Sequence, residues 1–303
     1  MIKKLGDKPL KDIKKLGERT LYIRGSPATL IYISDNCVYV VDPGVGSKRA
    51  KKLRSIIRSL NKDRIMCLLT HYHSDHIAIA EKIGCSEIWA SHQDSLFIKD
   101  PVLRNYMTYG YPFIASKYFL YNAPSVKVTH VLNAPCKIGK LEILHLPGHT
   151  LGQIGVLTDD SVAYLADSFF GRKVLEYAGI PYHFNPLLAL NTLEYVKEEI
   201  VRDIETLVIS HGPILNREEG KSLIEENKHR IMKIVDIVLD ELSKSPTSIA
   251  KITLKVLRAL NANISHTSLM LGMVFMKSLL ASLEEQGKIE PIISNEGLLW
   301  KRT

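Results

Sequence analysis

A short run of metal-binding side chains is the most informative stretch of this chain. Residues Thr70 to His76 contain three histidines and one aspartate in the order His-Tyr-His-Ser-Asp-His. Imidazole and carboxylate groups together suit zinc or iron. His71 and His73 can reach one metal ion, whereas Asp75 and His76, turned by the start of a helix, can serve a second ion beside it. The run therefore predicts a metal site in preference to a chance cluster.

The elements around this run must present it at one edge of a sheet. Residues 64–69 form an apolar segment typical of a buried parallel strand, and a helix is predicted to begin near Ser74. Open α/β sheets hold their ligands at the carboxyl ends of strands. Further strands are predicted over 20–23, 29–34, 37–41, 87–90, 142–149, 154–167 and 206–210, and helices over 47–60, with Ser47 as N-cap, and 185–203.

The pattern His-x-His-x-Asp-His after an apolar strand resembles the first motif of metallo-beta-lactamase-fold hydrolases. Three further motifs of that superfamily follow in the same order, within residues 146–152, 164–168 and 207–213. The resemblance covers residues 20–216 and implies an α/β fold with four αββα layers. It also implies that His149 completes the first metal's ligands, that Asp167 bridges the two metals and that His211 completes the second set. The implied ligands are His71, His73, Asp75, His76, His149, Asp167 and His211.

The chemistry that the resemblance implies is hydrolysis at two divalent metal ions. Zinc is expected first, and iron or manganese would accept the same ligands. Two ions about 3.5–4 Å apart can hold a bridging hydroxide at neutral pH and polarise the bond under attack. Asp75 is the implied catalytic residue, because it would ligate one ion and orient the attacking water. Asp42, in an Asp-Pro-Gly turn that resembles a family loop near the site, is expected to be structural.

Individual residues narrow the branch of the superfamily. Asp167 stands where class B beta-lactamases resemble one another in placing a cysteine, and His76 where an arginine is common, so antibiotic hydrolysis is not expected. Residues 166–170, Ala-Asp-Ser-Phe-Phe, are similar to a motif of glyoxalase II-like thioesterases. We therefore expect hydrolysis of a small thioester, ester or lactone. The alternatives are phosphodiester hydrolysis of RNA and a non-enzymatic binding protein with a vestigial metal site.

Aromatic side chains supply candidate walls for a substrate pocket. Phe169, Phe170, Tyr182 and His183 follow Asp167 and are the candidate substrate contacts. A second group of rings lies between the two halves of the predicted sheet: Tyr106, Tyr109, Tyr111, Phe113, Tyr118, Phe119 and Tyr121. These rings either pack against the sheet or a second subunit, or they wall a channel beside the metals.

Composition agrees with a metal-binding domain followed by a smaller module. The chain has 303 residues, 46% of them hydrophobic and 24% charged, enough for one large core and one small one. It lacks an apolar run of about 18 residues for a membrane helix and an amino-terminal signal peptide, so a cytoplasmic protein without membrane contact is expected.

The four cysteines, Cys37, Cys67, Cys85 and Cys136, show no Cys-x-x-Cys pairing and are expected to be reduced.

The first domain is predicted to end at residue 216, and residues 217–303 are predicted to form a second domain. Helices are predicted over 217–244, 249–260 and 266–286, followed by a hairpin over 288–300. This order resembles the winged-helix-like module of beta-lactamase-like hydrolases that include a mitochondrial endoribonuclease. The third helix is apolar on nearly every side at its start, which favours packing or a homodimer.

The net charge of +8 arises mainly before this module, because 13 basic residues after position 216 nearly balance 11 acidic ones. The excess lies in the amino-terminal segment and in the basic helix over 47–60. That helix either presents a solvated face or steers an anionic substrate or RNA toward the protein.

Overall fold

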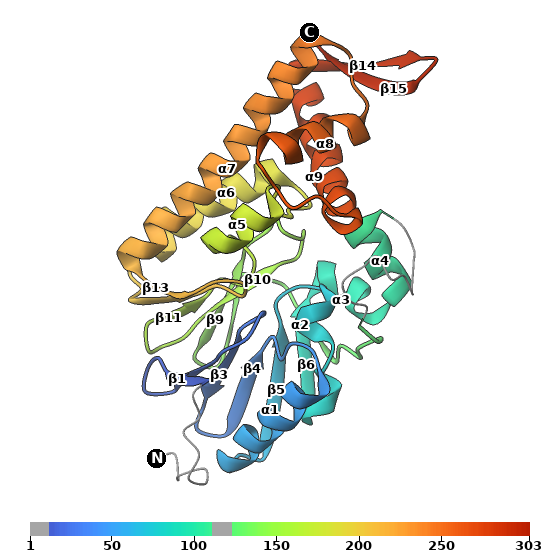
Figure 1. The fold of residues 1–303 in the computed structure, drawn as a ribbon. Helices are drawn as coiled ribbons and strands as arrows, with labels where there is room; N and C mark the ends of the chain where they lie inside the picture. The colour runs from blue at the N-terminus through green and yellow to red at the C-terminus, as the bar shows by residue number, and fades with distance from the viewer. Residues whose placement is uncertain (1–11, 111–122) are drawn as a thin grey trace.

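Two sheets pack face to face in the computed structural model, which describes residues 12–110 and 123–303 (Figure 1). The first sheet is antiparallel from β1 to β4 and parallel from β4 to β7. Its strands, in spatial order, are β1 (Ile13–Lys15), β2 (Thr20–Ile23), β3 (Thr29–Ile33), β4 (Cys37–Val41), β5 (Arg64–Leu69), β6 (Glu87–Ser91) and β7 (His130–Leu132).

The second sheet is antiparallel except for the parallel pair β11 and β12. Its spatial order is β13 (Ile214–Asn216), β12 (Thr206–Val208), β11 (Val162–Tyr164), β10 (Ile154–Leu157), β9 (Leu141–His145) and β8 (Cys136–Ile138). The predicted strand over 206–210 is therefore followed by one more strand, β13, which forms the edge of this sheet.

Alternation along the strands builds three hydrophobic layers. Leu30 and Leu68 point inward and meet Val156 and Val208 of the second sheet. Ile31 and its neighbours point outward and pack against α1. Because successive side chains of a strand face opposite sides, each sheet buries both faces. Helices cover the outer face of each sheet, which confirms the predicted αββα architecture.

The helices of the metal-binding region lie outside the two sheets or at their edges (Figure 1). They are α1 (Ser47–Ser59), α2 (Ser74–Ile77), the 3₁₀ turn η1 (Glu81–Ile83), α3 (His92–Lys99), α4 (Pro101–Tyr109), α5 (Arg172–Ala178), α6 (Pro186–Tyr195) and the π-helical turn η2 (Val196–Ile200). The predicted helix over 185–203 is thus α6 continued by a π turn. Gly46, and not Ser47, occupies the N-cap of α1 and makes no side-chain capping bond there.

The carboxy-terminal region contains the three predicted helices and a hairpin. They are α7 (Arg217–Lys244), α8 (Ile249–Ala259), α9 (His266–Glu285), β14 (Ile289–Ser294) and β15 (Gly297–Arg302). A capping box between Asn216 and Glu219 starts α7 at the predicted residue. One hydrophobic cluster joins Ala163 and Leu207 of the second sheet to α7, α8 and α9, so this region packs on the metal-binding region. Its likeness to a winged helix and the domain boundary after residue 216 stay predictions.

Among the described helices, α9 is the one that is long and apolar enough to cross a membrane, with a mean hydropathy of 1.3 over its most apolar 18 residues. Phe275, Met276, Leu279 and Leu280 of this helix are fully buried in the hydrophobic cluster shared with the second sheet. Helix α9 thus contributes side chains to the protein core.

The expectation of four reduced cysteines is wrong for two of them. Cys67 in β5 and Cys85 before β6 form a disulfide, with their Cα atoms 5.9 Å apart. The parallel pairing of β5 and β6 brings these positions together, and sequence spacing alone does not show that pairing. Cys37 and Cys136 are free thiols, as expected.

The ring-rich segment begins in α4, and α3 precedes it. Tyr109 of α4 is buried, whereas Tyr106 is 56% exposed. Arg104 is a charged residue at a fully buried position, so it interrupts the apolar pattern of α4. Its guanidinium donates hydrogen bonds to the carbonyl oxygens of Phe97 and Ile98. The other rings of the group, Tyr111, Phe113, Tyr118, Phe119 and Tyr121, lie outside the described residues.

Candidate metal centre

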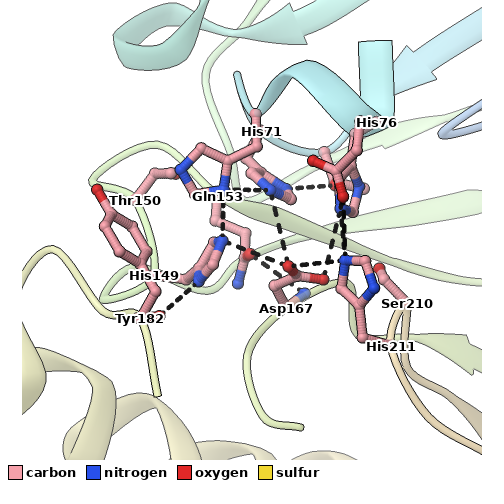
Figure 2. A network of polar contacts seen from close by, with 12 residues as sticks. His71, His76, His149, Thr150, Gln153, Asp167, Tyr182, Ser210 and His211 are labelled. Carbon is pink, nitrogen blue, oxygen red and sulfur yellow. Dashed lines mark hydrogen bonds and ion pairs between the residues drawn. The ribbon is translucent and has the colours of Figure 1, made fainter. Parts of the chain in front are cut away.

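The seven predicted ligands come from loops and one helix at the carboxyl ends of four strands. His71 and His73 follow β5, and α2 then carries Asp75 and His76. His149, Asp167 and His211 follow β9, β11 and β12. Figure 2 shows Asp167 between His149 and His211, at the centre of the group. The structure thus brings together residues that are up to 140 positions apart (211 − 71 = 140).

The first ligand set is formed by three imidazoles and one carboxylate. The Nδ1 atom of His73 lies 3.2 Å from Nε2 of His71 and 2.8 Å from Nε2 of His149. The Oδ2 atom of Asp167 lies 3.4 Å from Nε2 of His149 and 4.0 Å from Nε2 of His71. These four residues offer ligand atoms that all lie within 4.8 Å of one another.

The second ligand set shares Asp167 with the first. Nε2 of His211 lies 3.4 Å from Nε2 of His76 and 3.3 Å from Oδ2 of Asp75. The distance from Nε2 of His76 to Oδ2 of Asp75 is 3.8 Å. Asp167 presents Oδ1 to His76 at 3.6 Å and Oδ2 to His211 at 3.5 Å. Asp167 therefore borders both sets.

These distances fit two bound cations. Ligand bonds of about 2.0–2.1 Å in a tetrahedral site place neighbouring ligand atoms about 3.3 Å apart. The observed separations scatter around that value in both sets. Buried Oδ1 of Asp167 also has no hydrogen-bond partner among the described residues. Converging lone pairs repel one another unless a proton or a cation lies between them, so the donor set suits metal ions.

Four of the five histidines use their second ring nitrogen to bind the surrounding protein. Nδ1 of His76 lies 2.7 Å from the buried carboxylate of Asp42, and Nδ1 of His149 lies 2.8 Å from the backbone oxygen of Tyr182. Nδ1 of His71 contacts the Thr70 hydroxyl at 3.0 Å, and Nδ1 of His211 contacts the Ser26 hydroxyl at 2.7 Å. Such contacts fix the ring orientation and tautomer of metal-binding histidines.

Asp42 is the centre of a buried network that supports the second set. Besides His76, its carboxylate accepts hydrogen bonds from the backbone and hydroxyl of Thr70 and from the hydroxyl of Tyr164.

Ala166 adopts a left-handed backbone conformation (φ 50°) just before Asp167. Non-glycine residues are rarely found there, and such strain concentrates at functional sites.

Burial and neighbouring charges set the protonation of the ligands. Burial lowers the pKa of His71 far below its ordinary value, and it lowers the pKa of His149 to about 4. Both rings are therefore neutral near pH 7, the form that binds metal. Burial opposes ionisation of Asp167, but His211 and His76 outweigh it and hold the pKa of Asp167 far below its ordinary value.

A pocket of about 310 Å³ opens onto the ligands. His73, Asp75, His149, Asp167 and His211 line one side of it. The remaining wall is mainly apolar and includes Tyr109, Phe170, Val174, Ala178, Ile180, Pro181, Tyr182 and Leu271. Leu271 and Ser268 belong to α9, so the carboxy-terminal region forms part of this wall.

The predicted substrate contacts divide into two groups. Phe170 and Tyr182 line the pocket, whereas Phe169 and His183 are fully buried and are not part of its lining. Sequence reasoning missed the α9 residues and the hydroxyl of Ser26. No local motif marks them, because each reaches the site from a separate segment. Tyr109 of the ring-rich segment also lines the pocket, in line with the channel alternative.

Removing the Ser26 hydroxyl should weaken metal binding at the second ligand set. Ser26→Ala deletes the contact to Nδ1 of His211, and losing such a contact costs about tenfold or more in metal affinity. Zinc competition titrations with a chromophoric chelator measure this. Ser59→Ala, which deletes a hydroxyl bonded to the Ile56 carbonyl at the end of α1, is the matched control. Equal zinc affinity in the two variants would contradict the role of Ser26.

Known proteins resemble this chain in sequence and in fold. The family profile of the metallo-beta-lactamase superfamily matches residues 21–211. A hydroxyacylglutathione hydrolase of Haemophilus influenzae is 29% identical over 150 residues, which cover 47% of this chain and 66% of that protein. A hydroxyacylglutathione hydrolase of Shewanella loihica is 32% identical over 136 residues, covering 44% of this chain and 42% of that protein. The chain thus matches only part of each relative.

Two solved structures show the same fold over nearly the whole chain. A beta-lactamase domain protein from Burkholderia ambifaria superposes with a TM-score of 0.72 at 15% identity, covering 98% of this chain and 96% of that one. A metallo-beta-lactamase family protein from Thermus thermophilus superposes with a TM-score of 0.68 at 17% identity, covering 96% and 97%. With the family match across more than half of its length, the chain belongs to the metallo-beta-lactamase superfamily.

Proposed function

We propose that this protein is a dinuclear metal-dependent hydrolase of small thioesters, esters or lactones with an apolar acyl part. The observation that carries the proposal is the pair of ligand sets sharing Asp167 at one side of a small apolar pocket. Partial similarity to hydroxyacylglutathione hydrolases supports the thioester class first. Zinc is the proposed metal, because imidazole and carboxylate in near-tetrahedral sets suit it.

The ligand residues would divide the work as follows. Two divalent ions held by these residues would supply an activated water at neutral pH and polarise the carbonyl under attack. Asp75 lines the pocket with 37% of its side chain exposed, and both of its ion pairs use Oδ2. We assign its Oδ1 atom to accept a hydrogen bond from the attacking water and so orient it. Burial opposes ionisation of Asp75, but His76 and His211 lower its pKa, so the carboxylate is charged near pH 7.

The apolar wall would hold the acyl group and keep bulk water away from it. Phe170, Ile180 and Leu271 offer surfaces that suit an aliphatic or aromatic chain. The basic residues of α1 are absent from the described lining of this pocket. The pocket therefore favours a small-molecule substrate over RNA. The expected homodimer stays a prediction.

Elemental analysis of purified protein followed by a three-way substrate panel tests the proposal. The panel contains a lactoylglutathione-type thioester, a small lactone and a phosphodiester. Two metals per chain and turnover of the thioester or lactone are the expected results. One metal per chain after supplementation would contradict the dinuclear site. Turnover of the phosphodiester alone, falling steeply with salt, would replace this proposal with RNA hydrolysis.

Shortening Leu271 should weaken selection for apolar acyl groups. Leu271→Ala removes apolar surface from the pocket wall, and a change of this size in a hydrophobic pocket is worth about tenfold or more in kcat/KM. The loss should grow with acyl chain length in a series of thioesters. Leu269→Ala, at a position packed against the core and not in the pocket wall, is the control. Equal losses across the series would show that Leu271 does not contact the acyl group.

A further inference from the structure

A buried carboxylate outside the ligand sets links two loops that carry metal ligands. Asp94 lies in the first turn of α3 and is 1% exposed. Its Oδ2 atom accepts hydrogen bonds from the backbone N–H of Tyr72 at 3.2 Å and from the hydroxyl of Thr150 at 2.6 Å. Its Oδ1 atom accepts a hydrogen bond from the backbone N–H of Gly152 at 2.9 Å.

The donors of these bonds are neighbours of the first ligand set in the chain. Tyr72 lies between His71 and His73, and Thr150 follows His149 directly. One carboxylate therefore ties the loop after β5 to the loop after β9. The three imidazoles that meet at 2.8 to 3.2 Å come from these same two loops. The spacing between the loops thus depends on a contact shared by both.

The contact is too close to tolerate a side chain at position 152. A Cβ atom there would collide with the hydroxyl of Ser91 and would lie 2.6 Å from Oδ1 of Asp94. The glycine at the end of the Gly-His-Thr-Leu-Gly run is explained by this approach. Burial raises the pKa of Asp94 to about 7, although the three donors oppose the rise. Burying a carboxyl group is costly, which points to a role that an apolar residue would not fill.

We propose that Asp94 is a positioning residue that holds His71, His73 and His149 at metal-binding spacing. This inference rests on the metal-dependent function proposed above. An amide at this position would place an NH₂ group against the donors of Tyr72 and Thr150 or against that of Gly152, because it has one acceptor oxygen. Either orientation sets two donors against each other and pushes a loop away.

The test measures metal binding by the full-length protein and not its activity. Wild type and Asp94→Asn are titrated with zinc and, separately, with cobalt(II), whose visible absorption reports ligand geometry. We expect one of the two ions to bind 10- to 100-fold more weakly to Asp94→Asn, with an altered cobalt spectrum. The second ion should bind as in the wild type.

Asp160 offers a matched control for a purely structural effect. It accepts three comparable hydrogen bonds, from the backbone N–H of Arg19 and the hydroxyls of Thr20 and Thr158. It lies in the turn before β11, at the other end of that strand from Asp167. Asp160→Asn should lower thermal stability and leave both metal affinities and the cobalt spectrum unchanged.

Variants of Thr150 keep the test decisive if Asp94→Asn does not fold. Thr150→Val removes the 2.6 Å bond and keeps the carboxylate, and it should weaken one ion about tenfold. Thr150→Ser keeps the hydroxyl and should restore wild-type affinity. Wild-type binding of both ions by Asp94→Asn, or by Thr150→Val, would overturn the inference. A wild-type protein that binds no metal would instead contradict the proposed function.

Discussion

Asp75→Ala is expected to lower kcat at least 100-fold, which corresponds to about 2.7 kcal/mol of lost transition-state stabilisation. The physical reason is that one carboxylate serves two purposes in the proposed mechanism. Oδ2 of Asp75 belongs to the second ligand set, 3.3 Å from Nε2 of His211, and Oδ1 is assigned to orient the attacking water. Losing the side chain removes both contributions, whereas the pocket wall stays in place.

His183→Ala is the informative comparison for this variant. His183 is fully buried and absent from the pocket lining, and its ring centre lies 6.0 Å from that of His149. It can affect the site only through packing, so the loss of kcat should be well below that of Asp75→Ala. Steady-state kinetics with metal content measured on the same samples separates the two effects. Near-wild-type kcat in Asp75→Ala with two ions bound would show that the assigned mechanism is wrong.

Stripping the metals with a chelator is expected to abolish turnover and to lower the midpoint of thermal unfolding by about 5–10 °C or more. A ligand at 100 times its dissociation constant stabilises the native state by about 2.7 kcal/mol. In chains of this size each kcal/mol shifts the midpoint by about 2–4 °C. Calorimetry before and after chelation, and again after zinc is restored, measures the change.

The size of this shift should depend on pH with a definite sign. Burial opposes protonation of His76 and His211, but Asp167 and the neighbouring carboxylates raise the pKa of both rings in the metal-free protein. Metal must then displace protons from these rings, so its affinity falls as pH falls. The midpoint difference should shrink as the pH is lowered from 8 to 6. A metal-free protein, verified by elemental analysis, that melts at the original temperature would contradict the proposed metal centre.

The positions of the seven candidate ligands in the chain explain why they could be predicted from the sequence. His71, His73, Asp75 and His76 are close in sequence, and each of the other three candidate ligands follows an apolar strand. The superfamily resemblance then assigns them to two sets, and the structure brings all seven together. The αββα layers were predicted from the same resemblance, and apolar runs in the sequence located the buried strands.

Features that depend on the relative placement of distant segments were not predictable in this way. The Cys67–Cys85 disulfide depends on the pairing of β5 with β6, and no local pattern encodes that pairing. Asp94 draws its three donors from two loops that are far apart in the chain. Helix α4 was not predicted, because a buried arginine, Arg104, interrupts its apolar pattern.

Ser268 and Leu271 line the pocket but lie in a different part of the chain from the candidate metal ligands. The candidate ligands all precede residue 212, whereas this part of the wall is encoded in α9. Substitutions in the first turns of one helix can therefore change which molecules fit without altering any imidazole or carboxylate of the centre. Related chains with identical ligand motifs can accordingly differ in substrate, and the composition of this helix is the place to compare them.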